Sequence, residues 1–148
     1  MSDSKLRLPK PKLTDHPVDV GQRTEAAILS ELVRRGYAVL LPFGVNQRYD
    51  LVLDLDGKFV RAQCKTGRFR DGVVMFSTKS VQSNTRRTVV RDYGRDADVF
   101  LVHSPDRRGV YCVPVNEAPT TYMYLRVEPT LNGQKNRIRW ASDYELPA

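Results

Sequence analysis

Hydrophobic and polar residues follow a helical period in one early part of the chain. Between residues 20 and 35 the apolar side chains recur every three or four positions, as at Ile28 and Leu32, which is the spacing of an amphipathic helix. Asp19 is a suitable N-terminal cap, and Gly36 follows two arginines at the place where a helix would end. The pattern therefore predicts a helix over 20–35.

After this helix the period changes to two, which is the spacing of strands. Asp56-Gly57 is a signal for a two-residue turn, so the runs on either side of it are expected to pair as a hairpin. The sequence GRFRDG predicts a second hairpin. The polar, arginine-rich segment 78–96 is expected to be a loop that contains a short helix. The predicted strands are 37–43, 49–55, 58–66, 73–77, 98–103, 110–115 and 122–128.

Length and composition indicate one globular domain. The chain has 148 residues, of which 41% are hydrophobic and 28% charged, which is enough to bury a single core. Residues 1–18 are basic and rich in proline and are expected to form an extended arm, so the domain spans 19–148. No apolar run approaches the length of a membrane span, and the polar start does not resemble a signal peptide. A cytoplasmic protein with no membrane partner is expected.

The balance of charge favours a polyanionic partner. Twenty-four lysines and arginines against 17 acidic residues give a net charge of +7, which suits nucleic acid but also a membrane surface binder or a merely soluble protein. The two cysteines, Cys64 and Cys112, lack the spacing of metal ligands. A structural zinc site or a disulfide framework is therefore not expected.

The predicted hairpin places polar residues where a core strand would carry apolar ones. If Asp56 and Gly57 form the turn, Asp50 is opposite Gln63, and Lys65 shares their face because side chains alternate along a strand. A carboxylate, an amide and an ammonium group would then converge at the end far from the turn. The alternative is an ordinary cross-strand ion pair between Asp50 and Lys65 on a solvated face.

A second acidic residue stands on the predicted helix. Glu25 precedes Ile28 and Leu32 by three and seven residues, which places it on the apolar stripe. A carboxylate in that position needs a cation, a metal or a hydrogen-bond partner, because burial removes its hydration. Alternatively, Glu25 lies at the rim of the stripe and pairs with Arg23 or with another arginine.

In chain order, Glu25, Asp50 and the run Gln63-Cys64-Lys65 resemble the signature of the PD-(D/E)XK nuclease superfamily. The closest resemblance within it is to the group I intron-associated homing endonucleases, in which glutamine replaces the last acidic residue to give QxK. The segments DVFLVHSPDRRGVYCVPV and NRIRWASDYE are also similar to that family in order and spacing. Tyr49 stands where the superfamily has proline, and Gln63 brings no negative charge.

The resemblance implies an α/β (α+β) fold, a restriction-endonuclease-like core in which helices flank a central mixed β-sheet. It also implies a metal-dependent endonuclease with Mg²⁺ as cofactor and Mn²⁺ as a substitute. Asp50 and Glu25 would be metal ligands, together with the main-chain carbonyl of Cys64. Gln63 would ligate the ion or orient its water. Lys65 would position the attacking water and offset negative charge.

The expected partner is double-stranded DNA, bound by a homo-oligomer, either a dimer or a tetramer, because one small active site cuts one strand. In the cell, the resemblance implies a prokaryotic cytoplasmic protein that associates with the nucleoid when it binds DNA. A junction or repair nuclease of the same fold, or a DNA-binding module with an inactive site, remains an alternative to homing. The DNA contacts are expected from arginines in the basic segments, namely Arg68, Arg70, Arg86, Arg87, Arg91 and Arg95.

Overall fold

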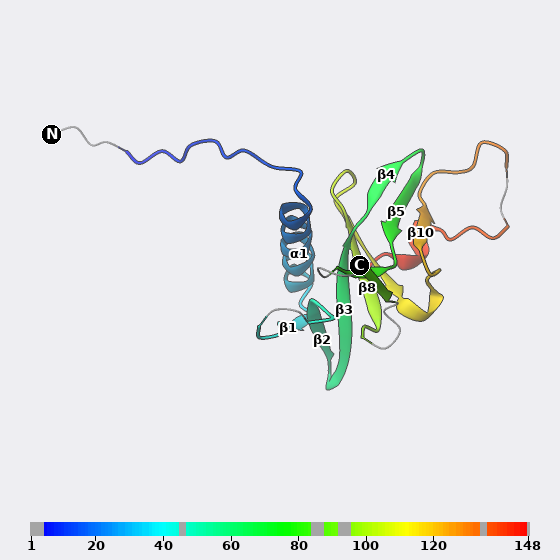
Figure 1. The fold of residues 1–148 in the computed structure, drawn as a ribbon. Coiled ribbons are helices and arrows are strands. Elements are labelled where there is room, and N and C mark those ends of the chain that lie inside the picture. The colour runs from blue at the N-terminus through cyan, green and yellow to red at the C-terminus, as the bar shows by residue number, and fades with distance from the viewer. Residues whose placement is uncertain (1–4, 45–46, 84–87, 92–95, 134–135, 148) are drawn as a thin grey trace.

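A five-stranded mixed sheet forms the centre of the protein (Figure 1). The computed structural model describes residues 5–44, 47–83, 88–91, 96–133 and 136–147, with the backbone alone for 80–83 and 88–91. In the central sheet, β3 and β8 run parallel and all other neighbours run antiparallel. In spatial order its strands are β1 (Ala38–Leu40), β2 (Leu51–Leu55), β3 (Lys58–Thr66), β8 (Val99–Ser104) and β9 (Gly109–Pro114).

The two faces of this sheet have different covers. Helix α1 (Pro17–Arg34) packs Ile28 and Leu32 against one face. The other face packs against a small antiparallel sheet, where the rings of Phe76 and Phe100 lie 5.7 Å apart. The mixed sheet of the predicted fold class is confirmed, although strands rather than a second helix cover this face. The small sheet consists of β10 (Tyr122–Arg126), β5 (Val73–Ser77) and β4 (Arg68–Arg70), and two 3-10 helices follow the core strands, η1 (Val115–Glu117) and η2 (Ala141–Tyr144).

The first helix begins three residues before the predicted position. His16, rather than Asp19, is its N-cap, and the His16 Nδ1 atom accepts a hydrogen bond from the Val18 N–H at 3.2 Å. Pro17 occupies the first helical position, where its missing N–H costs no hydrogen bond. The helix ends at Arg34, one residue before the predicted end, and is followed by Gly36, whose φ of +86° suits a residue without a side chain.

The predicted hairpin register is confirmed. Leu55 pairs with Lys58 around a two-residue turn, in which Asp56 and Gly57 both have positive φ, at 53° and 91°. These angles are typical of the type I′ turn that joins twisted antiparallel strands. However, β2 begins at Leu51, two residues later than predicted, and this shortening determines the site described below.

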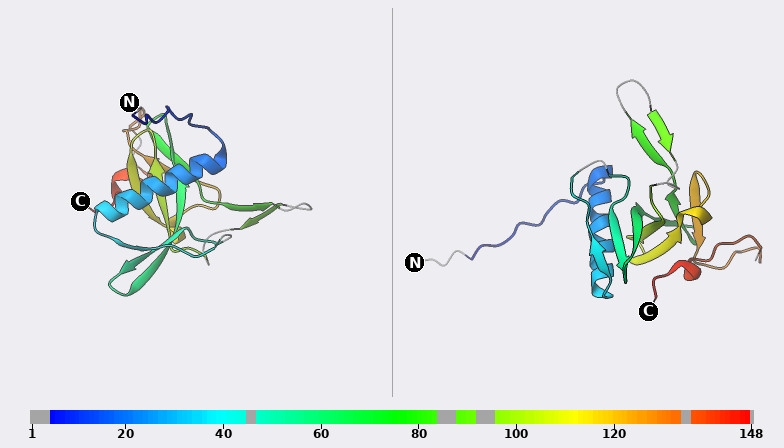
Figure 2. Two further views of the ribbon diagram at one scale, coloured as in Figure 1. Left: turned by 90° about the vertical axis from the view of Figure 1, so that its left-hand side faces the viewer. Right: turned by 90° about the horizontal axis from the view of Figure 1, so that it is seen from below.

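The prediction of a loop with a short helix over 78–96 is wrong for the described part of that segment. Instead, β6 (Ser80–Ser83) and β7 (Thr88–Arg91) pair as an antiparallel hairpin that projects from the body in both views of Figure 2. The runs SVQS and TVVR contain β-branched residues that favour strands. The polar, arginine-rich composition of the whole segment favoured a loop and outweighed this local preference. Among the described residues, no helix is both long and apolar enough to cross a membrane.

Candidate active site

The site lies at an edge of β3 that β2 leaves open. β3 continues to Thr66, whereas its pairing with β2 ends where Leu51 meets Ala62. Residues 63–66 pair with β8 on their other side. Since a strand has hydrogen-bonding groups on both sides, the main-chain groups of this segment that point away from β8 are available to other partners.

Asp50 takes the place of the missing strand. Its N–H donates to the Ala62 carbonyl at 2.8 Å, and its Oδ2 atom accepts a hydrogen bond from the Cys64 N–H at 2.7 Å. The N–H and C=O of one strand residue point to the same side. The Cys64 carbonyl therefore points toward the edge that holds the Asp50 carboxylate.

Glu25 reaches this edge from α1. Its side chain is exposed, because the buried stripe of the helix runs through Thr24, Ile28 and Leu32 instead. The prediction that Glu25 lies on the buried stripe is therefore wrong, because Thr24, one position earlier, lies there instead. The hydrogen-bond partner of Glu25 is Asp50 rather than an arginine. Partial burial first, and then hydrogen bonding to Asp50 and the negative charge of Asp50, raise the pKa of Glu25 to about 7. The Glu25 carboxyl group therefore keeps its proton up to near neutral pH.

Gln63 and Lys65 project from the face of β3 opposite to α1. Ala62 and Cys64 belong to the core under the helix, so the alternating residues point toward the small sheet. The Lys65 Nζ atom donates to the Lys79 carbonyl at 3.1 Å and lies 5.8 Å from the centre of the Phe100 ring. The prediction that Asp50, Gln63 and Lys65 share one face is thus corrected: Asp50 and Glu25 lie at the open edge of β3, and Gln63 and Lys65 lie on the face opposite to α1.

The oxygen-rich donors at this edge fit a hard divalent cation. Asp50 and Glu25 offer two carboxylates that repel each other when both are ionised, and the Cys64 carbonyl points to the same side. Among the residues that the structure describes, no three His, Cys, Asp or Glu side chains gather in a way that could hold a metal. Carbonyl, amide or water oxygens would have to complete the coordination. The Cys64 thiol is no candidate ligand, because burial, then Asp50 and Glu25, raise its pKa far above the usual range.

Two of the predicted DNA-contacting arginines continue from the same strand. Arg68 and Arg70 lie on β4 with exposed side chains, and Phe69 between them packs against the core. Arg91 is the last residue of β7. Arg86, Arg87 and Arg95 lie outside the described residues.

Sequence reasoning missed a partly buried pair of threonine hydroxyls beside the site. Thr24 is only 3% exposed, and its Oγ1 atom lies 2.5 Å from the Oγ1 of Thr66. The pair joins α1 to the end of β3, one residue from Glu25 and one from Lys65. The spacing of Thr24, Ile28 and Leu32 by four residues was the signal that could have placed this threonine on the buried stripe.

A comparison with protein families decides the identity of this fold. The sequence profile of the PD-(D/E)XK endonucleases matches residues 16–147. The chain belongs to the PD-(D/E)XK endonuclease family. Its structure is similar to that of a bacterial homing endonuclease, I-Ssp6803I, with a TM-score of 0.66 and 24% identity over 84% of this chain and 85% of that one. Among curated proteins, none matches the sequence.

For this PD-(D/E)XK endonuclease family member, the prediction remains that Asp50 and Lys65 are the first acidic residue and the lysine of the family name. On that prediction, Tyr49 and Gln63 stand where the name has proline and the second acidic residue. The proline position lies in the backbone before β2, where tyrosine causes no break. At Gln63 the change removes a charge, so Glu25 is the other carboxylate that the structure places beside Asp50.

Proposed function

We propose that this family member is a Mg²⁺-dependent endodeoxyribonuclease that hydrolyses phosphodiester bonds in double-stranded DNA and acts as a site-specific homing enzyme. The observation that carries the proposal is the Glu25–Asp50 carboxyl pair at the open edge of β3, beside the strand segment that bears Lys65. The homing role is supported by the QxK arrangement of Gln63 and Lys65 and by the similar fold of a bacterial homing endonuclease.

Asp50 and Glu25 would hold the metal, with the Cys64 carbonyl as a neutral ligand. A bound Mg²⁺ would supply a water of lowered pKa and positive charge beside the reacting phosphate. In the free protein, Glu25 keeps a proton at pH values below about 7. Binding of a cation therefore requires Glu25 to release that proton, which makes metal affinity increase with pH.

Lys65 and Gln63 would act on the phosphate from the other face of β3. The Lys65 ammonium group, oriented by the Lys79 carbonyl at 3.1 Å, would offset the negative charge that develops on the phosphate oxygens. The Gln63 amide brings a donor and an acceptor but no charge, which suits it to orient a water molecule.

A plasmid digest tests the function. Supercoiled DNA with millimolar Mg²⁺ should be nicked or linearised, and EDTA should abolish the reaction. Shifted but uncut DNA would support an inactive DNA-binding module instead. Preferential cleavage of a four-way junction over linear duplex would support a junction nuclease.

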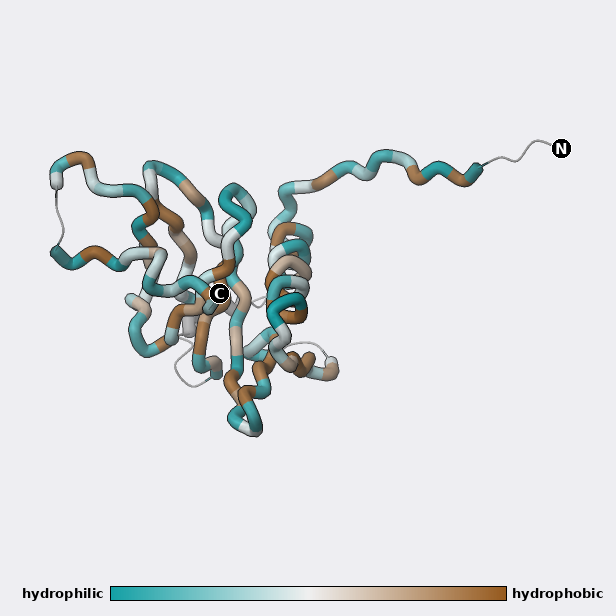
Figure 3. Tube along the Cα trace, turned by 180° about the vertical axis from the view of Figure 1, so that it is seen from behind, coloured by the Kyte–Doolittle hydropathy of each residue, from teal (hydrophilic) through white to brown (hydrophobic). Residues whose placement is uncertain are grey.

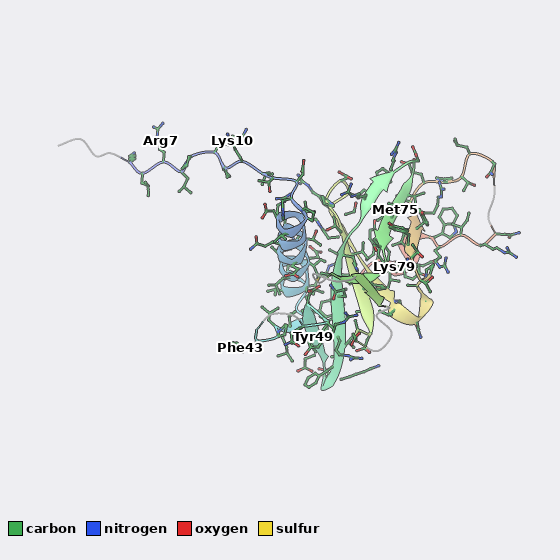
Figure 4. The ribbon with its side chains drawn as sticks, viewed as in Figure 1. Arg7, Lys10, Phe43, Tyr49, Met75 and Lys79 are labelled. Atoms are coloured by element: carbon green, nitrogen blue, oxygen red, sulfur yellow. The ribbon has the colours of Figure 1, made fainter. Side chains whose placement is uncertain are left out.

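We further propose that the protein acts as a homo-oligomer and that its edge patch forms the contact between copies. The edge patch consists of Leu40, Leu41, Phe43 and Phe59. Their exposed fractions are 47%, 63%, 101% and 61%, and β1 is an edge strand of the central sheet. Figure 3 shows hydrophobic segments at this lower end of the molecule, and Figure 4 shows Phe43 far from Met75. Exposed apolar side chains beside an open strand edge favour association.

Replacing Phe59 by Glu should lower the oligomeric mass. A buried charge in an apolar contact is costly, so we expect dimers or tetramers of the wild type to dissociate toward monomers in light scattering after size exclusion. Leu131→Glu is the control, because Leu131 is 108% exposed and lies outside the edge patch. A monomeric wild type at micromolar concentration would contradict the proposal.

A further inference from the structure

A long groove runs between the N-terminal half of α1 and the small sheet. It has a volume of about 1470 Å³ and is lined on one side by Arg23 and Thr24 of α1 and on the other by Met75 of β5 and Tyr124 of β10. We call it the α1–β4 groove. The proposed chemistry uses none of these side chains, so the groove needs an explanation of its own.

The floor of the α1–β4 groove continues the strand that carries the site. β3 passes through Gly67 into β4, so Thr66, Arg68 and Arg70 alternate onto the same face and all three line the groove. At Gly67 an added Cβ would lie 2.6 Å from the Val74 Cγ1 atom. Only glycine allows the strand to pass this closely between the two sheets.

Strand pairing arranges the rest of the floor in a row. Arg68 pairs with Met75, and Met75 pairs with Tyr124. A cation, a polarizable thioether and a phenol ring therefore lie side by side across three strands. Tyr124 is 56% exposed, whereas the neighbouring row of Val74 and Leu125 is fully buried beneath the sheet. The row presents both charge and apolar surface to whatever enters the groove.

Arginines outnumber carboxylates in the lining of the groove, where Arg23, Arg68, Arg70 and Arg108 stand against three aspartates. The strands of the floor contribute Arg68 and Arg70 but no carboxylate. The acidic lining residues, Asp15, Asp71 and Asp106, come from the arm and from two turns at the rim. Such a floor complements a chain of phosphates joined by sugars, because arginine binds phosphate oxygens while tyrosine packs on sugars or bases.

The groove also begins beside the site. The hydrogen-bonded Thr24 and Thr66 both line the groove, and each threonine is adjacent in sequence to a proposed site residue, Glu25 or Lys65. The groove therefore adjoins α1 and β3, the two elements that carry Glu25 and Lys65.

We propose that the α1–β4 groove holds the DNA strand on one side of the cleaved phosphate and that Tyr124 and Arg68 position it. The inference rests on the proposed nuclease function. These contacts address phosphate and sugar, so they set the placement of the strand and not the recognised sequence.

The test compares Tyr124→Ala with Tyr122→Ala. Both tyrosines project from the same face of β10, with exposed fractions of 56% and 46%, but only Tyr124 lines the groove. The binding probe is a fluorescent 30-base-pair duplex of mixed sequence, followed by anisotropy in EDTA over a salt series, and cleavage is followed separately in the plasmid digest with Mg²⁺. We expect Tyr124→Ala to weaken binding about tenfold and Tyr122→Ala to change it less than twofold. Arg68→Ala should reduce the slope of log affinity against log salt by about one.

The outcomes separate the inference from the function. A wild type that cleaves, together with equal affinities of Tyr124→Ala and Tyr122→Ala, would overturn the groove alone. A wild type that neither binds nor cleaves would overturn both. Thermal melts of all three variants check that each is folded. Because both tyrosines are exposed, their replacement should not unfold the protein, so a difference in DNA affinity between the two variants would not come from unfolding.

Discussion

Replacing Asp50 by Asn should abolish DNA cleavage, with a loss of about a thousandfold or more in rate, while DNA binding and the thermal midpoint stay close to those of the wild type. Asparagine keeps an oxygen that can accept the hydrogen bond from the Cys64 N–H but lacks the charge that holds a cation. Single-turnover cleavage, anisotropy and thermal melts measure the three quantities.

Asp54→Asn is the matched control for this substitution. Asp54 lies on β2 in the same hairpin, and its Oδ1 atom likewise accepts a main-chain hydrogen bond, from the Gly57 N–H at 2.8 Å. It lies at the turn end, far from the site, so cleavage should be retained. Lys65→Met should behave as Asp50→Asn, because methionine keeps the apolar stem beside Phe100. If both site variants instead failed to fold, Asp50 and Lys65 would serve the fold rather than catalysis.

Replacing Glu25 by Gln should remove both a pH dependence and a metal dependence of stability. The pKa of Glu25 is about 7 in the folded protein against an ordinary value of 4.5, so folding favours the protonated form. Its contribution is fully present below pH 4.5 and is lost as the pH rises to about 7. In EDTA above pH 7, Glu25→Gln should therefore melt higher than the wild type, by about 2–4 °C after allowance for solvent screening of an exposed side chain.

Mg²⁺ should reverse the order in which the wild type and Glu25→Gln melt. Millimolar Mg²⁺ should stabilise the wild type through binding to the folded state, and stabilise Glu25→Gln less. Glu31→Gln is the control on the same helix: two arginines, Arg35 first, lower the pKa of Glu31, so its loss should remove stability above pH 4.5 without any response to Mg²⁺. A Glu25→Gln protein that is strongly destabilised in EDTA would show that Glu25 forms a salt bridge.

Local signals predicted the hairpin that carries the site. Asp56-Gly57 determines a turn with two positive φ angles, and the turn determines every pair from Leu55 with Lys58 to Leu51 with Ala62. The same regular pairing, extended by one residue, placed Asp50 opposite Gln63. In the structure the Asp50 N–H bonds to the Ala62 carbonyl instead, and no sequence signal marks where a strand leaves its partner.

Long-range packing explains the other differences. The position of Glu25 at the rim depends on how α1 rotates against the sheet, and the contact between Thr24 and Thr66 settles that rotation. The partner of Lys65 is a main-chain carbonyl at Lys79, which is near only because β5 leads back past β3. Such contacts join residues far apart in the sequence and have no local pattern.

Because one continuous strand passes through Gly67, it fixes the distance between Lys65 of the proposed cleavage site and the arginines of β4 that are proposed to hold DNA. At about 3.3 Å per residue, Arg68 lies about 10 Å and Arg70 about 17 Å from Lys65 along the chain. An insertion between them would have to pass a point where even a methyl group would meet Val74 and Val102. Under the proposed function, this strand keeps the cleaved phosphate and the bound DNA segment at a constant separation. Side chains on β4, β5 and β10 can therefore be replaced in protein engineering to change the affinity for DNA. The distance between these DNA contacts and the cleaved phosphate would stay the same.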